Sequence, residues 1–265
     1  MSLTIRGILW FGAYVAMVLA PGVVAMAADP FTAPRPALVE ISVALGLVAF
    51  AVMVAQFALV SRLQASSRPF GTDALIQFHQ YIGFIGLALV VAHPLLLTAS
   101  GLPWSTWNPF SGRVAMQSGA VALWALVLLV VTTVARQRLR LAYEAWQGLH
   151  LGLAILAAVA MLVHVLAVNG YARAAPLRYT LVAYTFAFGA LTLNYRVLRP
   201  LRLRARPWTV VANLEAGGST RTLRVRPEAC RVRVRPRPVR VAHHGRDAAL
   251  VAAASAVDLL VGRAR

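Results

Sequence analysis

Six apolar runs, separated by short segments of polar and turn-forming residues, dominate the first two hundred positions of the chain. A helix of about 20 apolar residues is long enough to cross the hydrocarbon core of a bilayer. The pattern therefore predicts an all-α membrane protein, a bundle of six transmembrane helices. The predicted spans are residues 5–27, 38–60, 75–98, 114–135, 147–169 and 177–198.

Composition supports a membrane protein and excludes several other classes. The chain has 265 residues, is 60% hydrophobic and carries a formal net charge of +18, which does not describe a soluble globular domain. The basic tail has no interleaved aromatic residues, so nucleic-acid binding is not expected. Cys230 is the only cysteine, which excludes an internal disulfide and a thiolate metal cage.

The distribution of arginine predicts the orientation of the bundle. One set of connections carries Arg62, Arg68, Arg136, Arg138, Arg140, Arg196, Arg199, Arg202, Arg204 and Arg206; the opposite set carries only Arg35, Arg113, Arg173 and Arg178. The positive-inside rule then places both termini in the cytoplasm of a cell or inner membrane. Arg6 and Ala25-Met26-Ala27 also resemble a cleavable signal peptide, but we favour an uncleaved helix. Cleavage would leave the orientation of the later helices unchanged.

Four histidines inside the apolar runs are the candidate functional residues. His79 and His93 are fourteen residues apart, as are His150 and His164. Fourteen residues are about two heptads, or roughly 21 Å of helix, so both histidines of each run share one face. Because the third and fifth helices run in the same direction, we expect His79 and His150 at the inner level and His93 and His164 at the outer level. Ionisable residues at membrane depth usually mark a cofactor or an ion path.

Small residues accompany the histidines on the same face. They are Gly83, Gly86, Ala154 and Ala157, at offsets of four and seven. These positions leave a slot for a flat macrocycle, and histidine is a common axial ligand of haem iron. The pattern predicts two stacked b haems, each held by two histidines. Pro94, directly after His93, is expected to kink or end the third helix.

The motifs Phe78-His79-Gln80-Tyr81-Ile82-Gly83, Ala92-His93-Pro94 and Trp146-Gln147-Gly148-Leu149-His150, together with His164, resemble the ferric reductase-like transmembrane family. That family includes ferric reductases and the membrane portion of NADPH oxidases. The resemblance covers residues 1–200 and implies electron transfer from a cytoplasmic flavin and NAD(P)H, through two haems, to external ferric chelate or dioxygen. Arg113, Arg173 and Arg178 are candidates to pair with haem propionates or to attract an anionic chelate, although they also suit lipid phosphates.

The C-terminal segment departs from the family. Residues 209–265 contain no Phe, Tyr or Trp, so we expect residues 201–265 to form a short cytoplasmic tail, β or disordered. Pro207 to Pro227 resembles the start of the family's FAD-binding barrel, but the flavin motif and the glycine-rich nicotinamide motif do not follow. His243-His244-Gly245 is no substitute. We therefore expect a truncation or frameshift near residue 228, and no NAD(P)H oxidation by this chain alone.

Several further interpretations concern the tail and the bundle. Arg231–Pro238 alternates like an exposed strand, and the apolar run Ala248–Val261 is too short for a seventh span. The bundle is alternatively a haem subunit that receives electrons from a separate flavoprotein or quinol. It is also open that the chain is a non-catalytic helical bundle in membrane lipid, the inert product of a damaged gene.

Overall fold

The computed structural model describes residues 3–31, 33–61, 70–204, 208–215 and 221–227. The chain divides into two compact units, Met1–Arg204 and Ala205–Arg265. Several features singled out above lie outside the described residues. They are Arg62, Arg68, Arg206, Cys230, Arg231–Pro238, His243-His244-Gly245 and Ala248–Val261.

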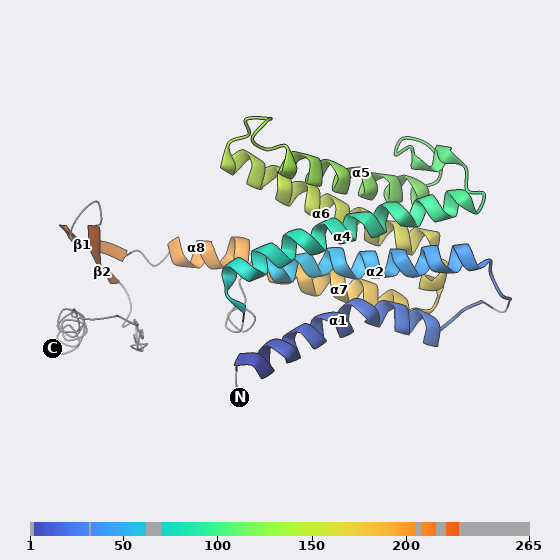
Figure 1. Ribbon diagram of the computed structural model, residues 1–265, viewed down its shortest axis with the longest axis horizontal. Helices are drawn as coiled ribbons and strands as arrows, with labels where there is room; N and C mark the ends of the chain where they lie inside the picture. The colour runs from blue at the N-terminus through green and yellow to red at the C-terminus, as the bar shows by residue number, and fades with distance from the viewer. Residues whose placement is uncertain (1–2, 32, 62–69, 205–207, 216–220, 228–265) are drawn as a thin grey trace. The chain divides into compact units, whose positions relative to one another are not determined.

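The first unit is the predicted helical bundle (Figure 1). Among the described residues, six helices are long and apolar enough to cross a membrane, which confirms the predicted all-α, multi-pass membrane fold. The long helices are α1 (Leu3–Ala27), α2 (Ala37–Leu59), α4 (Thr72–Ala99), α5 (Val114–Val134), α6 (Tyr143–Val168) and α7 (Ala175–Leu193). Short 3-10 helices, η1 (Trp104–Trp107) and η2 (Tyr171–Arg173), lie in two of the connections.

The structure decides between the two alternatives for Pro94, and it places one helix end beyond the predicted span. Pro94 lies inside α4, which continues to Ala99, so this proline does not end the helix. A proline removes one backbone hydrogen bond, and the rest of a membrane helix tolerates that loss when neighbouring groups compensate. The sixth helix continues beyond residue 198, through a π-helical turn at Asn194–Leu198 into α8 (Arg199–Arg204).

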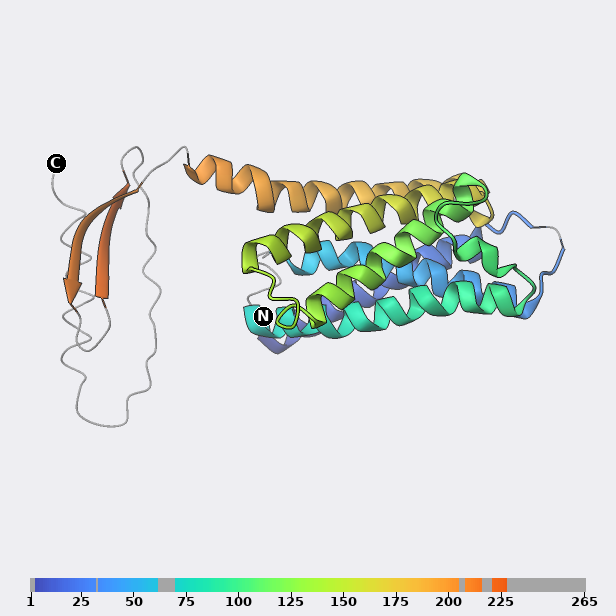
Figure 2. The same cartoon turned by 90° about the horizontal axis from the view of Figure 1, so that it is seen from above.

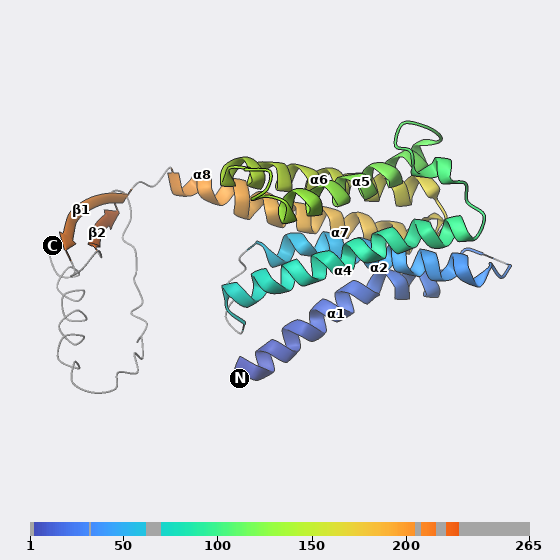
Figure 3. The same cartoon turned by 45° about the horizontal axis from the view of Figure 1, so that its top comes forward.

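The bundle is assembled from two tight helix pairs. Figures 2 and 3 show α4 alongside α2, and α5 alongside α6. Within the described bundle, α4 and α6 each pack chiefly on their own partner and hardly approach each other through the backbone. The two helices that carry the histidines are therefore held apart, and only side chains span the space between them.

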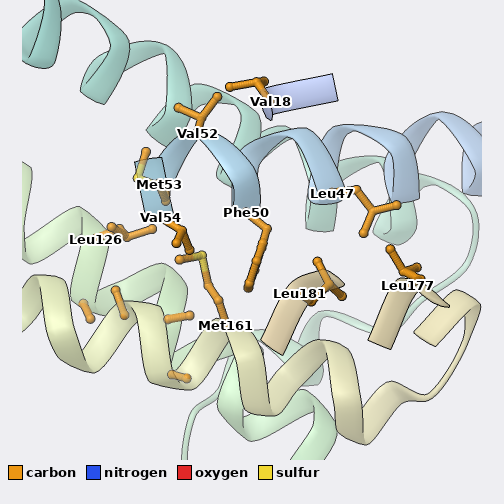
Figure 4. Close-up of a cluster of buried hydrophobic side chains, with 14 of the residues drawn as sticks. Val18, Leu47, Phe50, Val52, Met53, Val54, Leu126, Met161, Leu177 and Leu181 are labelled. Carbon is orange, nitrogen blue, oxygen red and sulfur yellow. The ribbon is translucent and has the colours of Figure 1, made fainter. Parts of the chain in front are cut away.

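The buried core fixes α2 at the centre of this arrangement. Phe50 of α2 is 1% exposed and points toward Leu181 of α7 and Met161 of α6 (Figure 4). Leu177 and Leu181 of α7 are fully buried. Close packing of such side chains holds the helices in a defined register, on which the geometry between α4 and α6 depends.

The second unit has a two-stranded antiparallel sheet. Strand β1 (Trp208–Glu215) pairs with β2 (Arg221–Pro227), and the pairing is irregular between Val210 and Ala212. This confirms a short tail with β structure.

Candidate functional site

The structure brings the four membrane histidines together in the two expected pairs. The ring centroids of His79 and His150 are 6.3 Å apart, and those of His93 and His164 are 6.2 Å apart. Each pair joins α4 to α6. The equal spacing of fourteen residues on two helices that run in the same direction produces both pairs at once.

The rings of His93 and His164 are anchored by backbone carbonyls of the neighbouring helices. His93 Nδ1–H donates to the carbonyl of Ser42 on α2 at 2.8 Å, and His164 Nδ1–H donates to the carbonyl of Ala115 on α5 at 2.5 Å. The Ser42 hydroxyl also donates to the carbonyl of His93 at 2.7 Å. Because a carbonyl only accepts, these bonds place the proton on Nδ1 and leave the Nε2 lone pair free.

Two glycines make these anchors possible. A Cβ added to Gly46 on α2 would lie 3.0 Å from His93 Nδ1, and one added to Gly119 on α5 would lie 2.7 Å from His164 Nδ1. Gly46 and Gly119 each follow the accepting residue, Ser42 or Ala115, by four positions, one helical turn. The missing side chains let each imidazole reach the carbonyl. Neither glycine was among the predicted site residues.

The His79–His150 pair is anchored differently. The Thr133 hydroxyl of α5 donates to the Leu129 carbonyl at 2.7 Å, so its oxygen accepts from His150 Nδ1–H at 3.1 Å. The indole N–H of Trp146 reaches the same oxygen at 3.4 Å, and its ring centroid lies 5.4 Å from that of His150. His79 Nδ1 is buried and has no partner among the described residues.

This geometry suits a metal held between two imidazoles. Bonds from a metal to imidazole nitrogen are about 2 Å long, and the ring centre lies roughly 1.2 Å farther, so two axial imidazoles have centroids about 6 Å apart. Both pairs match that separation. Within the described part of the chain no three His, Cys, Asp or Glu side chains converge as a metal cage. A metal in either pair would therefore need its other ligands from a cofactor such as a porphyrin.

A cavity of about 260 Å³ lies between the helices at the His93–His164 pair. Both histidines line it, together with Gly46, Gly119 and apolar residues of α2, α4, α5, α6 and α7. An apolar cavity with two convergent nitrogen ligands has the character of a cofactor site. The residues at this cavity fit a haem held by two histidines. They offer two imidazole nitrogens, both rings have the proton on Nδ1, and the distance between the rings is suitable.

Residues 45–161 match the model of the family described as ferric reductase like transmembrane component. This part of the chain, somewhat less than half of the whole, is similar to that family. The match includes Gly46, His79, His93, Gly119 and His150, and it ends three residues before His164. The similarity suggests a membrane domain for transmembrane electron transfer, and the family in general implies haem binding. No curated protein matches the chain.

The small residues that were predicted to form the slot in this ferric reductase-like domain lie in different surroundings. A Cβ on Gly86 would lie 2.0 Å from the terminal methyl of Met53 and 3.1 Å from Val52, both on α2. A Cβ on Gly83 would lie 3.7 Å from Gln56 Nε2. These contacts give the two glycines a role in packing α4 on α2. Ala157 is 1% exposed in the core, and Ala154 is half-buried. A contact of these four residues with haem stays a prediction.

The arginines of the ferric reductase-like domain near the His93–His164 cavity also differ in surroundings. Arg178 donates to the Ala172 carbonyl and to the Asn169 side chain. These two hydrogen bonds hold its guanidinium group at the end of α6. Arg113 and Arg173 are exposed. Arg35, which was not a predicted site residue, lines the cavity. It pairs with Glu40 at 3.1 Å and lies over the ring of Phe31 at 4.4 Å.

Glu40 also holds the connection between α6 and α7. The Tyr171 hydroxyl donates to Glu40 Oε2 at 2.5 Å, and the Tyr171 ring lines the same cavity. The hydrogen bond to the Glu40 carboxylate, followed by burial and nearby negative charge, raises the pKa of Tyr171 to about 12, an effect that Arg35 partly opposes. The Tyr171 hydroxyl therefore stays protonated throughout the neutral range.

We predict that Tyr171→Phe destabilises the bundle by about 1 kcal/mol, since it removes a hydrogen bond to a partly exposed carboxylate and keeps the ring. The tyrosine pKa is raised by folding, so the stabilisation is complete below pH 10 and is lost only as the pH rises through about 12. Thermal midpoints in detergent should differ between variant and wild type by the same amount at pH 6 and pH 9. Tyr179→Phe, at a residue that is 70% exposed, should leave the midpoint unchanged. A difference that grew between pH 6 and pH 9 would contradict the role assigned to Glu40.

Proposed function

We propose that the chain carries electrons across a membrane through two b haems. One would be held by His79 and His150, the other by His93 and His164. The observation that carries the proposal is the pair of histidine couples at 6.3 and 6.2 Å, in which three of the four Nδ1 atoms are engaged by acceptors. When bound, haem would supply the one-electron carrier, because its iron changes between the ferric and ferrous states.

The residues of the chain determine what kind of carrier results. Each site offers two histidine nitrogens, so a haem held there would have no free position for dioxygen or a chelate. The hydrogen bonds on Nδ1 of His93, His150 and His164 would hold these imidazoles in a fixed orientation, which favours electron transfer over ligand exchange. An external acceptor would take electrons at the edge of the cavity that the His93–His164 pair lines.

The distribution of arginine is the basis for the direction of electron transfer that we propose. In the described residues, Arg136, Arg138 and Arg140 follow α5, and Arg196, Arg199, Arg202 and Arg204 follow α7. These connections carry more arginine than the opposite ones, so we place them and both termini in the cytoplasm of a cell or inner membrane. The His79–His150 pair is then the inner site and receives electrons. The donor would be a cytoplasmic flavin and NAD(P)H, or a separate flavoprotein or quinol, and the acceptor ferric chelate or dioxygen outside.

A reduced-minus-oxidised spectrum of the purified chain in detergent tests the proposal. Dithionite should produce the sharp bands of low-spin haem b, and pyridine haemochrome analysis should give two haems per chain. Carbon monoxide should leave the reduced spectrum unchanged, because histidines fill both axial positions. A chain that carries no haem after expression with added haem precursor is an inert bundle. A ratio of one, or a high-spin spectrum that binds carbon monoxide, contradicts the two-site assignment.

A further inference from the structure

His79 is the exception among the four histidines, and a second buried polar group beside it has no partner either. His79 Nδ1 and both amide atoms of Gln56 lack hydrogen-bond partners among the described residues. Gln56 on α2 is only 9% exposed. A buried amide without a partner is costly, and leucine at this position would pack without that cost. Packing alone therefore does not explain a glutamine here.

The register of α2 against α4 places Gln56 opposite His79. Ser42 of α2 provides the acceptor for His93. In an antiparallel pair, fourteen residues forward along α2 correspond to fourteen residues back along α4. That step leads from Ser42 to Gln56 and from His93 to His79. Gln56 therefore occupies the same position on α2 relative to His79 as Ser42 does relative to His93.

The proximity of Gly83 to Gln56 supports this register. A Cβ on Gly83 would lie 3.7 Å from Gln56 Nε2. Gly83 follows His79 by one helical turn on the same face of α4. The amide of Gln56 thus reaches the face of α4 that carries the histidines, at the level of the inner pair.

The pair of α5 and α6 shows how the inner histidine of the other helix obtains its hydrogen bond. The carbonyl of Ala115 accepts from His164, and Leu129 lies fourteen residues after Ala115. Thr133 likewise lies fourteen residues after Gly119. There the Thr133 hydroxyl connects His150 Nδ1 to the Leu129 carbonyl. The residue that corresponds to Thr133 is Val60, directly after the last residue of α2, and it has no hydroxyl. An acceptor for His79 must come from another side chain.

We propose that Gln56 is the positioning residue of His79. Its side-chain Oε1 accepts the Nδ1–H of His79 and turns the Nε2 of that ring toward the metal. The inference rests on the proposed function, since it concerns the hydrogen bond behind an axial ligand. Acceptors behind a metal-bound imidazole raise its basicity and fix its orientation. Gln56 therefore tunes the inner haem and leaves the outer one alone.

Redox titration of the full-length haem protein, with low-temperature EPR, tests the assignment. Gln56→Leu removes the acceptor, so the potential of the haem held by His79 and His150 should rise, and its low-spin signal should shift. Gln56→Glu supplies a stronger acceptor and should lower the same potential. Thr133→Val, which removes the hydrogen bond seen on His150, should shift that haem in the direction of Gln56→Leu. The His93–His164 haem should keep its potential in all three variants.

Matched controls separate positioning from packing. Gln80→Leu makes the same chemical change at an exposed residue next to His79 and should shift neither potential. Tyr14→Phe removes a hydroxyl that is also buried without a partner among the described residues, and the Tyr14 ring packs on Phe78 next to His79; this variant should also have no effect.

Unchanged potentials and spectra in both Gln56 variants would overturn the proposal, as would shifts of equal sign in the two. An effect of Tyr14→Phe that matched Gln56→Leu would move the role to Tyr14 and overturn it as well. A wild-type chain without haem would overturn the proposed function, and this inference with it. Two bound haems whose potentials and spectra do not change in the Gln56 variants would overturn this inference alone.

Discussion

Alanine in place of His79 or His150 should abolish one and the same haem, and alanine in place of His93 or His164 should abolish the other. Each metal would depend on one imidazole from α4 and one from α6, at centroid separations of 6.3 and 6.2 Å. Losing either imidazole leaves a single axial ligand in an apolar site. The haem-to-protein ratio should fall from two to one in each of the four variants.

The spectrum of the remaining haem identifies which one was lost. His79→Ala and His150→Ala should leave reduced bands of the same position and the same midpoint potential. His93→Ala and His164→Ala should leave a second, different set. His243→Ala changes a histidine of the tail and should retain both haems. If His79→Ala and His150→Ala left spectrally different haems, the pairing of α4 with α6 would be refuted.

The membrane fold could be predicted from the sequence because its signal is local. A span is a continuous apolar run, and the six predicted spans agree with the six helices to within a few residues at most ends. The pairing of His79 with His150, and of His93 with His164, also followed from the sequence. Equal spacing on two helices of one direction leaves no other matched arrangement.

The residues behind the histidines could not be predicted, because they lie on other helices. Gly46 and Gly119 are far in sequence from the rings that they accommodate, and neither stands out in an apolar run. The same holds for Thr133 and Gln56. They become visible only when the registers of α2 against α4 and of α5 against α6 are known.

For the predicted slot residues, the sequence indicated the helix face but not the neighbouring helix that this face contacts. Gly83 and Gly86 share the histidine face of α4 by helical periodicity, but that face also packs on α2. A helix face is wide enough to meet two neighbours, and periodicity does not tell which neighbour a given residue contacts. Gly86 meets Met53 and Val52 of α2, whereas the glycines that touch the histidine rings belong to α2 and α5.

Alanine in place of Gly119 should strip the His93–His164 site of its haem while the other site keeps its own. The added Cβ would lie 2.7 Å from His164 Nδ1 and 2.9 Å from Cε1 of the same ring, closer than carbon approaches such atoms. The ring cannot yield freely, because the Ala115 carbonyl holds its Nδ1 and the metal would hold its Nε2. Disturbing the hydrogen bond behind a ligand typically lowers metal affinity by about 10- to 100-fold.

Gly46→Ala should have the same selectivity and a smaller effect. Its Cβ would lie 3.0 Å from His93 Nδ1 and 3.2 Å from Cε1, so a shift of a few tenths of an ångström relieves the contact. Haem titration of the haem-depleted chain should therefore show affinity at this site falling in the order wild type, Gly46→Ala, Gly119→Ala. The His79–His150 site should keep wild-type affinity throughout.

Two further glycines provide matched controls for this series. A Cβ at Gly152 on α6 or at Gly189 on α7 would meet no atom within 4 Å. Alanine at either position also favours the helix, so any loss of haem cannot come from helix propensity. Both control variants should bind two haems as the wild type does. Full occupancy and an unshifted spectrum in Gly119→Ala would mean that His164 is not held against Ala115 when haem is bound, because a ring in that position has no room for the methyl group.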